Sequence, residues 1–190
     1  MSPLTAIEAV GVVAGLGYVV FAIRESAWCW PSGIVSALAY VVFFHQQRLP
    51  GQSALQAILA GVCVYGWWHW RRGDSTSGRL LVSRAPQRVL LATGAAAALG
   101  AVAIGLLLRQ STESVAPFVD GGLVAASLAA QWMAARKWLE NWLVWIAVNI
   151  VSIGLFVSQG HGLTTGLYLL YLVMAFVGFR SWSRSLRVRA

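Results

Sequence analysis

Uniformly apolar stretches of about 20 residues recur along the chain, and they limit the folds that it can adopt. Residues 89–108 read VLLATGAAAALGAVAIGLLL, without a charge and without alternation of polarity. A helix that crosses the ~30 Å hydrocarbon layer needs ~20 such residues, whereas a transmembrane β-barrel shows ~10-residue segments of alternating polarity. Composition agrees, because 58% of the residues are hydrophobic and only 11% are charged. We therefore predict an all-α integral membrane protein.

Hydropathy and turn signals divide the chain into seven predicted transmembrane helices. We place them, to within a few residues, at 5–23, 29–45, 52–70, 89–108, 117–134, 139–158 and 163–180. The connections are short except after the third helix, where RRGDSTSGRLLVSRAPQR is polar and punctuated by Gly and Pro, as expected of a loop.

The distribution of basic residues predicts the orientation, because cytoplasmic loops collect Lys and Arg. With the C-terminus inside, only Arg48 and Arg109 lie outside. The inner side holds the other twelve: Arg24, Arg71, Arg72, Arg79, Arg84, Arg88, Arg136, Lys137, Arg180, Arg184, Arg187 and Arg189. This predicts an N-out, C-in protein. A net charge of +8 could also indicate a nucleic-acid partner, but the placement of the charges between apolar spans favours topology, and we expect no nucleic acid.

Shifting the chain by 112 residues over itself reveals a weak internal repeat. Without a gap it aligns Arg24 with Arg136, Trp30 with Trp142, Ile34 with Ile146, Phe44 with Phe156, Gly66 with Gly178 and Trp70 with Trp182. Each copy would hold three helices, and one helix would link them. We predict a parallel 3+1+3 pseudo-repeat of the SWEET type, with residues 1–72 as the first repeat, 73–112 as the loop and linker helix, and 113–190 as the second repeat with a basic tail.

The sixth predicted helix carries the sharpest polar signal, in the stretch ENWLVWIAVN. Spacings of three and four place Trp142, Trp145 and Asn149 on one face, and Ser152 extends that face. Asn149 lies roughly 13–15 Å from the inner end at 1.5 Å per residue, close to the bilayer midplane. An amide at that depth forms either an interhelical hydrogen bond or part of a ligand cavity, and the two neighbouring Trp favour the cavity.

Further candidate ligands come from the third and seventh helices and from the second. Gln56 and Tyr168 are equivalent in the repeat, as are Tyr40 and Ser152, and the set comprises Gln52, Gln56, Tyr168, Tyr171 and Tyr40. Each alone is typical of helix packing. Together they predict a cavity of aromatic faces, amides and hydroxyls, which suits a flat, polar and possibly cationic solute.

Other Trp residues lie near the inner ends of the spans. For Trp67, Trp68, Trp70 and Trp182 we predict an interfacial aromatic belt.

Catalytic and ion-coupling groups are sparse. Glu8 and Asp120 are equivalent in the repeat and could carry a proton or cation, but both lie near the outer ends of their helices, which favours a structural role. No convergent catalytic set or metal cluster is evident, so we expect neither enzymatic activity nor a cofactor. An intramembrane enzyme and a membrane protein that binds a solute without moving it are the alternatives from other classes.

These motifs resemble the PnuC family of bacterial vitamin transporters. The resemblance runs from about Glu8 to Trp182 and is carried by ESAWCWPSGIVSALAYVVFF, by YGWWHWRR and above all by the W-x-x-W-x-x-x-N pattern of Trp142, Trp145 and Asn149. It implies a multi-pass homotrimer in the inner membrane, with a 3+1+3 helix plan. It also implies that these three residues bind substrate together with Gln56 and Tyr168.

The resemblance further implies facilitated diffusion of nicotinamide riboside, drawn inward by a cytoplasmic kinase that phosphorylates it. Thiamine or another vitamin or nucleoside is the alternative solute. The riboside is favoured, because its pyridinium suits a Trp face and its carboxamide pairs with Asn or Gln. The aminopyrimidine of thiamine would be served by a carboxylate, which the predicted cavity lacks.

Overall fold

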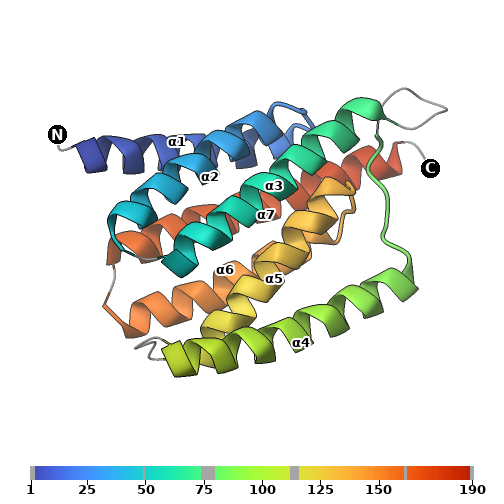
Figure 1. Cartoon of the computed structure of the whole chain (residues 1–190). Helices are drawn as coiled ribbons and strands as arrows, with labels where there is room; N and C mark the ends of the chain where they lie inside the picture. The colour runs from blue at the N-terminus through green and yellow to red at the C-terminus, as the bar shows by residue number, and fades with distance from the viewer. Residues whose placement is uncertain (1–2, 49, 74–79, 112–115, 161, 189–190) are drawn as a thin grey trace. The chain divides into compact units, whose positions relative to one another are not determined.

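The chain is all-helical in a computed structural model, which describes residues 3–48, 50–73, 80–111, 116–160 and 162–188. Within these residues it forms seven helices (Figure 1). They are α1 (Pro3–Ile23), α2 (Cys29–Gln46), α3 (Pro50–Arg72), α4 (Gln87–Ser111), α5 (Pro117–Ala135), α6 (Asn141–Ser158) and α7 (Gly162–Arg187). All seven predicted helices are confirmed to within a few residues, except that α7 continues to Arg187 instead of ending at 180. Arg79 and Arg189 of the predicted inner set lie outside the described residues.

Five of these helices are long and apolar enough to cross a membrane, namely α1, α4, α5, α6 and α7. The other two carry more polar ends: α2 finishes with His45 and Gln46, and α3 finishes with His69, Arg71 and Arg72. Length and composition therefore support five spans directly, and spanning by α2 and α3 stays a prediction.

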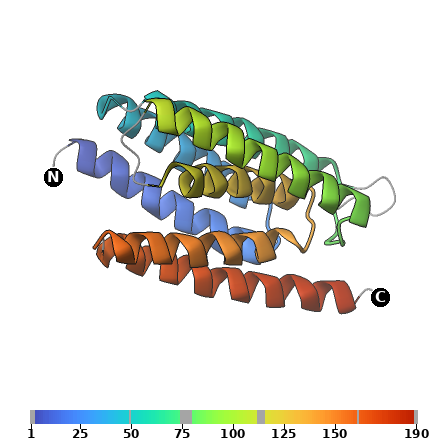
Figure 2. The ribbon, with the colours of Figure 1, turned by 90° about the horizontal axis from the view of Figure 1, so that it is seen from below.

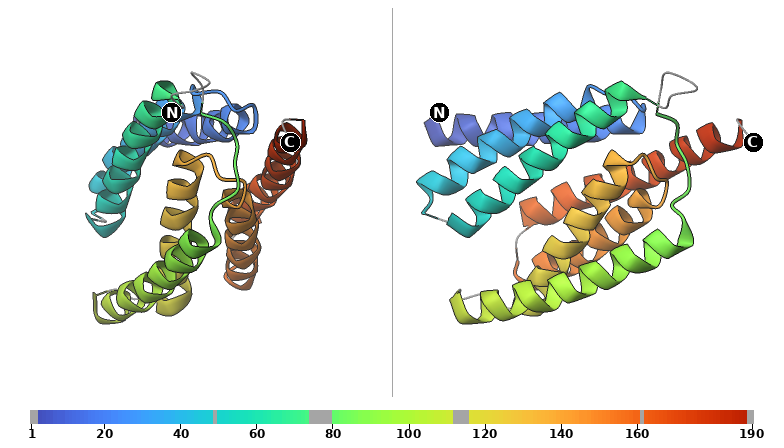
Figure 3. Two further views of the ribbon diagram at one scale, coloured as in Figure 1. Left: turned by 90° about the vertical axis from the view of Figure 1, so that its right-hand side faces the viewer. Right: turned by 45° about the vertical axis from the view of Figure 1, so that its right-hand side comes forward.

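The first of two structural units contains α1, α2 and α3, and also the short segment Ala135–Lys137. The three helices lie side by side, α2 between α1 and α3, in every view (Figures 1 and 3). Hydroxyl groups join them, because Ser36 Oγ donates to the carbonyl of Gly11 at 2.8 Å and Ser53 Oγ donates to that of Val41 at 3.1 Å. Such bonds satisfy polar groups in spans that have no water to bond.

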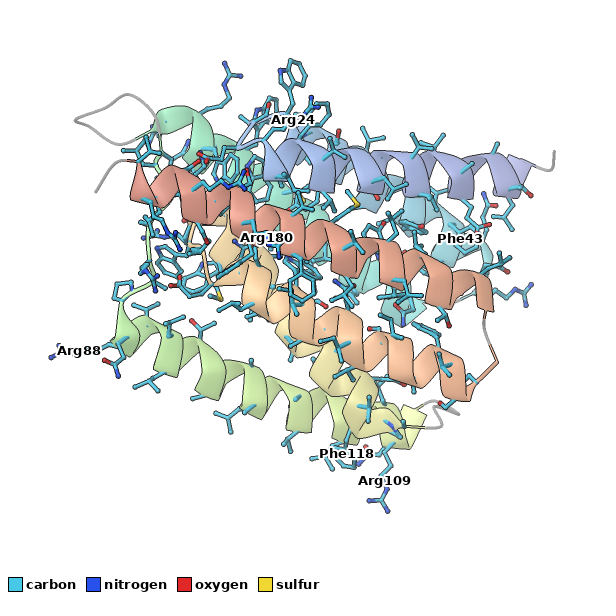
Figure 4. All side chains as sticks on the ribbon, turned by 180° about the vertical axis from the view of Figure 1, so that it is seen from behind. Arg24, Phe43, Arg88, Arg109, Phe118 and Arg180 are labelled. Atoms are coloured by element: carbon cyan, nitrogen blue, oxygen red, sulfur yellow. The ribbon has the colours of Figure 1, made fainter. Side chains whose placement is uncertain are left out.

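The second unit contains α4 to α7. Helices α6 and α7 form an antiparallel pair (Figure 2). Arg88 and Arg109 lie at opposite ends of α4, and Phe118 of α5 lies at the Arg109 end (Figure 4). The segment before α4 is tied to the turn before α6, because Leu139 N–H donates to the carbonyl of Ser83 at 2.9 Å. These bonds position the start of α6.

Helices α4 and α5 approach so closely at Gly121 that a side chain there has no room. A Cβ atom at Gly121 would lie 2.6 Å from the carbonyl oxygen of Ala101 and 2.7 Å from the nitrogen of Gly105. Both neighbours are backbone atoms, so they cannot rotate away. Small residues that let helix backbones approach are typical of membrane helix contacts.

Replacing Gly121 with alanine should therefore destabilise the protein by about 1–3 kcal/mol, the usual cost of overpacking. The adjacent Gly122 is the matched control, because a Cβ there would meet no heavy atom within 4 Å. Thermal unfolding of both variants in detergent checks this. Equal stability of the two variants would contradict the close approach.

Local geometry recurs at the 112-residue spacing that the sequence indicates. Trp30 lies over Gly66 and edge-on to Trp70, at 5.4 Å between ring centroids and 86° between ring planes. Trp142 lies over Gly178 and edge-on to Trp182 in the same way, at 5.5 Å and 88°. The two copies therefore share the packing at this end of their second and third helices.

The backbone repeats the same spacing. Among the described residues, the non-glycine positions with positive φ are Glu25 (55°), Arg48 (57°) and Lys137 (58°), and Gly160 also has positive φ (74°). Glu25 and Lys137 are 112 residues apart, and so are Arg48 and Gly160. A left-handed conformation is unfavourable for a residue with a Cβ, so its recurrence at equivalent turns indicates that each copy turns between its helices in the same way.

The predicted aromatic belt is correct for two residues and wrong for two others. Trp67 and Trp68 are 37% and 50% exposed, whereas Trp70 is 7% and Trp182 is 0% exposed. The buried pair packs edge-on against Trp30 and Trp142. A Trp near a helix end fits either environment, and the facing glycine one helix turn earlier, Gly66 or Gly178, distinguishes them.

Candidate functional site

Asn149 lies in the middle of α6 and is 4% exposed. Its Nδ2 donates to the carbonyl of Trp145 at 2.8 Å, one turn earlier in the same helix. This bond occupies one of the two amide protons and fixes the orientation of the amide plane. The amide oxygen is left to accept a hydrogen bond from another donor. Asn149 is therefore held in position by its own helix and retains polar groups for recognition.

Hydroxyl and aromatic groups from α6 and α7 meet next to this position. Ser152, one turn after Asn149, is buried and is hydrogen-bonded to Tyr168 of α7. The Tyr168 ring lies 5.2 Å from that of Phe156 and 6.3 Å from that of Tyr171. The structure thus brings together four candidates of the second unit: Asn149, Ser152, Tyr168 and Tyr171. Sequence reasoning predicted the residues, but it could not predict the Ser152–Tyr168 bond between helices.

The two Trp residues of the helix-6 motif differ in their surroundings. Trp142 is buried over Gly178 and against Trp182, whereas Trp145 is half-buried. The indole N–H of Trp142 has no hydrogen-bond partner among the described residues, and the same is true of Trp30. Because Trp30 and Trp142 are equivalent in the repeat, we attribute this shared feature to the packing of the helices and assign Trp142 a positioning role.

Three candidates belong to the first unit. Tyr40 stacks on Phe44 at 5.8 Å and packs over Gly11 of α1. In the first part of α3, Gln52 is exposed and Gln56 is half-buried. The structure describes the two units separately. The predicted assembly of these three side chains with Asn149 and Tyr168 into one cavity therefore stays a prediction.

The repeat is symmetric in its scaffold and asymmetric in its polar groups. The positions equivalent to Trp145 and Asn149 are Gly33 and Ala37. Both are buried, and a Cβ at Gly33 would lie 2.9 Å from Cys63 Sγ and from Tyr18 Cδ2. The first copy therefore fills this region with small residues and tight packing, while the second copy places an indole and an amide there.

Ionisable candidates are less convergent. Glu8 is exposed on α1, and Asp120 lies half-buried in the first turn of α5. No group of three or more His, Cys, Asp or Glu residues that could hold a metal ion occurs among the described residues.

Sequence analysis missed a buried ion pair, because it counted Lys137 only as a loop charge. Lys137 Nζ lies 3.3 Å from Glu25 Oε2, and the two side chains are 8% and 16% exposed. The same Nζ donates to the carbonyl of Leu80 at 2.9 Å and lies 4.5 Å from the ring centroid of Trp70. The available signal was the 112-residue spacing of two opposite charges.

Comparison with known proteins decides the family. The profile of the nicotinamide mononucleotide transporter family matches residues 5–184, nearly the whole chain. The chain belongs to this family. Its members include the PnuC transporters, so the resemblance found in the sequence is confirmed, and the protein is a member of a family of membrane transporters for vitamins.

Two relatives in the nicotinamide mononucleotide transporter family illustrate its range. The riboflavin/roseoflavin transporter RibM of Streptomyces davaonensis is 30% identical over 178 residues, which cover 92% of this chain and 83% of RibM. The nicotinamide riboside transporter PnuC of Escherichia coli is 26% identical over 211 residues, which cover 98% of this chain and 88% of that protein. These relatives carry different vitamins on related sequences.

A solved structure of the same family has this fold. The crystal structure of the vitamin B3 transporter PnuC matches with a TM-score of 0.77 and 23% identity, over 100% of this chain and 85% of that one. The helical architecture is therefore that of a PnuC transporter.

Proposed function

We propose that the protein carries nicotinamide riboside across the bacterial inner membrane by facilitated diffusion. The observation that carries the proposal is the buried, pre-oriented amide of Asn149 beside the Ser152–Tyr168 hydrogen bond. A few fixed polar groups among aromatic side chains are typical of small-molecule sites. The family and the PnuC relatives supply the vitamin class.

Each group has a role that follows from its chemistry. The Asn149 amide would pair with the carboxamide of the riboside, and the half-buried indole of Trp145 would face the cationic pyridinium. The hydroxyls of Ser152 and Tyr168 would bond the ribose, with Tyr171 alongside. Gln56, Gln52 and Tyr40 would complete the site from the first repeat.

Transport in this proposal is not coupled to an ion gradient. The exposure of Glu8 and the place of Asp120 in the first turn of α5 support this, because ion-coupling carboxylates lie deep in the membrane. Uptake would be driven by a cytoplasmic kinase that phosphorylates the solute and traps it.

The proposal includes an N-out, C-in homotrimer with a parallel 3+1+3 repeat. The matched Trp–Gly–Trp contacts and the matched left-handed residues support the repeat. The basic residues that α3 and α7 carry in their last turns support the orientation.

Riboflavin is a second candidate solute, because RibM matches this chain at 30% identity. Its isoalloxazine ring is flat and carries imide and carbonyl groups that an amide can bond. Thiamine remains a comparison solute, although no proposed site residue supplies a carboxylate for its aminopyrimidine.

Calorimetry on the detergent-purified protein tests the solute, with nicotinamide riboside, riboflavin and thiamine measured side by side. We expect the tightest binding for the riboside, and then flux of the riboside into liposomes without ATP or an ion gradient. Tightest binding of riboflavin or thiamine would reassign the solute. Flux only with a proton gradient would refute uncoupled transport. Binding without flux, or a chemically altered product, would favour the non-transporting binder or the enzyme.

A further inference from the structure

Glu25 and Lys137 occupy equivalent positions of the proposed repeat, in the turns that precede α2 and α6. Both residues adopt the left-handed conformation, with φ of 55° and 58°. Both side chains are largely buried, and their charges lie 3.3 Å apart. A casual surface ion pair would combine neither burial nor equivalent backbone strain. The pair therefore needs an explanation that the solute site does not give.

Stability alone explains this pair poorly. The cost of removing two charges from water nearly cancels their attraction, and apolar residues of similar volume often stabilise a protein equally well. A contact that must open differs, because separated charges can be hydrated, whereas separated apolar surfaces cannot. Ion pairs are accordingly among the contacts that rearrange when proteins switch between states.

We propose that the Glu25–Lys137 pair is a reversible lock of the transport cycle, closed in one end state and open in the other. Lys137 is well placed for this role, because it also donates to the carbonyl of Leu80 and lies over the Trp70 ring. Opening of the pair would release the turn before α6, the turn before α2 and the segment after α3 together. The lock presupposes the proposed transport, because only a transporter must alternate between end states.

The chain contains its own reporter of this opening. It has two cysteines, Cys29 and Cys63, and both are buried and free. Cys29 begins α2 four residues after Glu25, and the charge of Lys137 acts on its thiol. Opening of the lock should expose this thiol to a small reagent, and Cys63→Ala leaves Cys29 as the only thiol.

The experiment measures the rate at which N-ethylmaleimide labels Cys29 in proteoliposomes, in the Cys63→Ala background and without any solute. Glu25→Gln and Lys137→Met each remove the pair from one side, and we expect at least about tenfold faster labelling in both. Arg24→Gln is the matched control, because Arg24 is an exposed charge in the same turn. Its labelling rate should stay within about twofold of the parent.

Solute flux and affinity complete the test, with whichever vitamin the parent transports. Both variants should lose at least about fivefold in flux while the Kd changes by less than about threefold. Labelling rates equal to that of Arg24→Gln would overturn the lock, as would unchanged flux, or failure of both variants to give monodisperse protein. Because labelling needs no solute, a wrong solute assignment would leave that arm of the test intact.

Discussion

Replacing Asn149 with leucine should weaken solute binding by about tenfold to a hundredfold. The substitution removes the amide that the proposed site offers to the solute, and a hydrogen bond lost in a buried site costs about 1–3 kcal/mol, with a factor of ten for each 1.4 kcal/mol. Leucine is tolerated in a membrane helix, so the protein should remain folded. Calorimetry with the preferred vitamin measures the loss, and thermal unfolding confirms the fold.

Asn141 provides the matched control, because it is a second buried asparagine in the same helix. Its Nδ2 bonds the carbonyl of Trp138, so its amide also caps its own backbone. The equivalent residue in the first repeat is Cys29. Asn141→Cys should therefore leave the Kd within about threefold of the parent. Equal losses in the two variants, or an unchanged Kd in Asn149→Leu, would reduce Asn149 to a packing role.

Replacing Gly178 with alanine should destabilise the protein by about 1–3 kcal/mol, the range for an overpacked core. A Cβ there would lie 2.6 Å from three ring atoms of Trp142, and that ring is fixed edge-on against Trp182. Gly66→Ala should do the same, because its Cβ would lie 2.5 Å from the Trp30 ring. Thermal unfolding in detergent is the measurement.

Two further variants make the Gly178 test specific. A Cβ at Gly166, on the same helix, would meet no heavy atom within 4 Å, so Gly166→Ala should stabilise by up to about 1 kcal/mol through helix propensity. Adding Trp142→Phe to Gly178→Ala reduces the ring and should recover part of the lost stability. Recovery would confirm that Trp142 positions the helices, and its absence would argue against the packing role.

The helices were predictable because each is encoded locally, by about 20 apolar residues or by an apolar run between turn signals. The end of α7 was missed, since SWSRSLR after Arg180 is polar and was assigned to the tail, although none of its residues stops a helix. The local signal marks where the membrane ends, and the helix continues past that point to Arg187.

The site was predictable in its residues and less so in its contacts. Spacing alone placed Asn149 and Ser152 on one face of α6, because helical periodicity is local. The Ser152–Tyr168 bond and the Glu25–Lys137 pair join residues that are distant in the sequence, and neither follows from periodicity. Burial of Trp182 likewise depends on α6 lying against α7. Whether Gln56 meets Asn149 stays a prediction.

The opposite charges of Glu25 and Lys137 have an evolutionary consequence. In a symmetric assembly of two identical three-helix chains, equivalent residues are the same, so these two positions would both be Glu or both be Lys. Like charges at that separation would repel. This ion pair can therefore exist only after duplication and fusion allowed the two halves to diverge. It is a feature that a homodimeric ancestor could not have had.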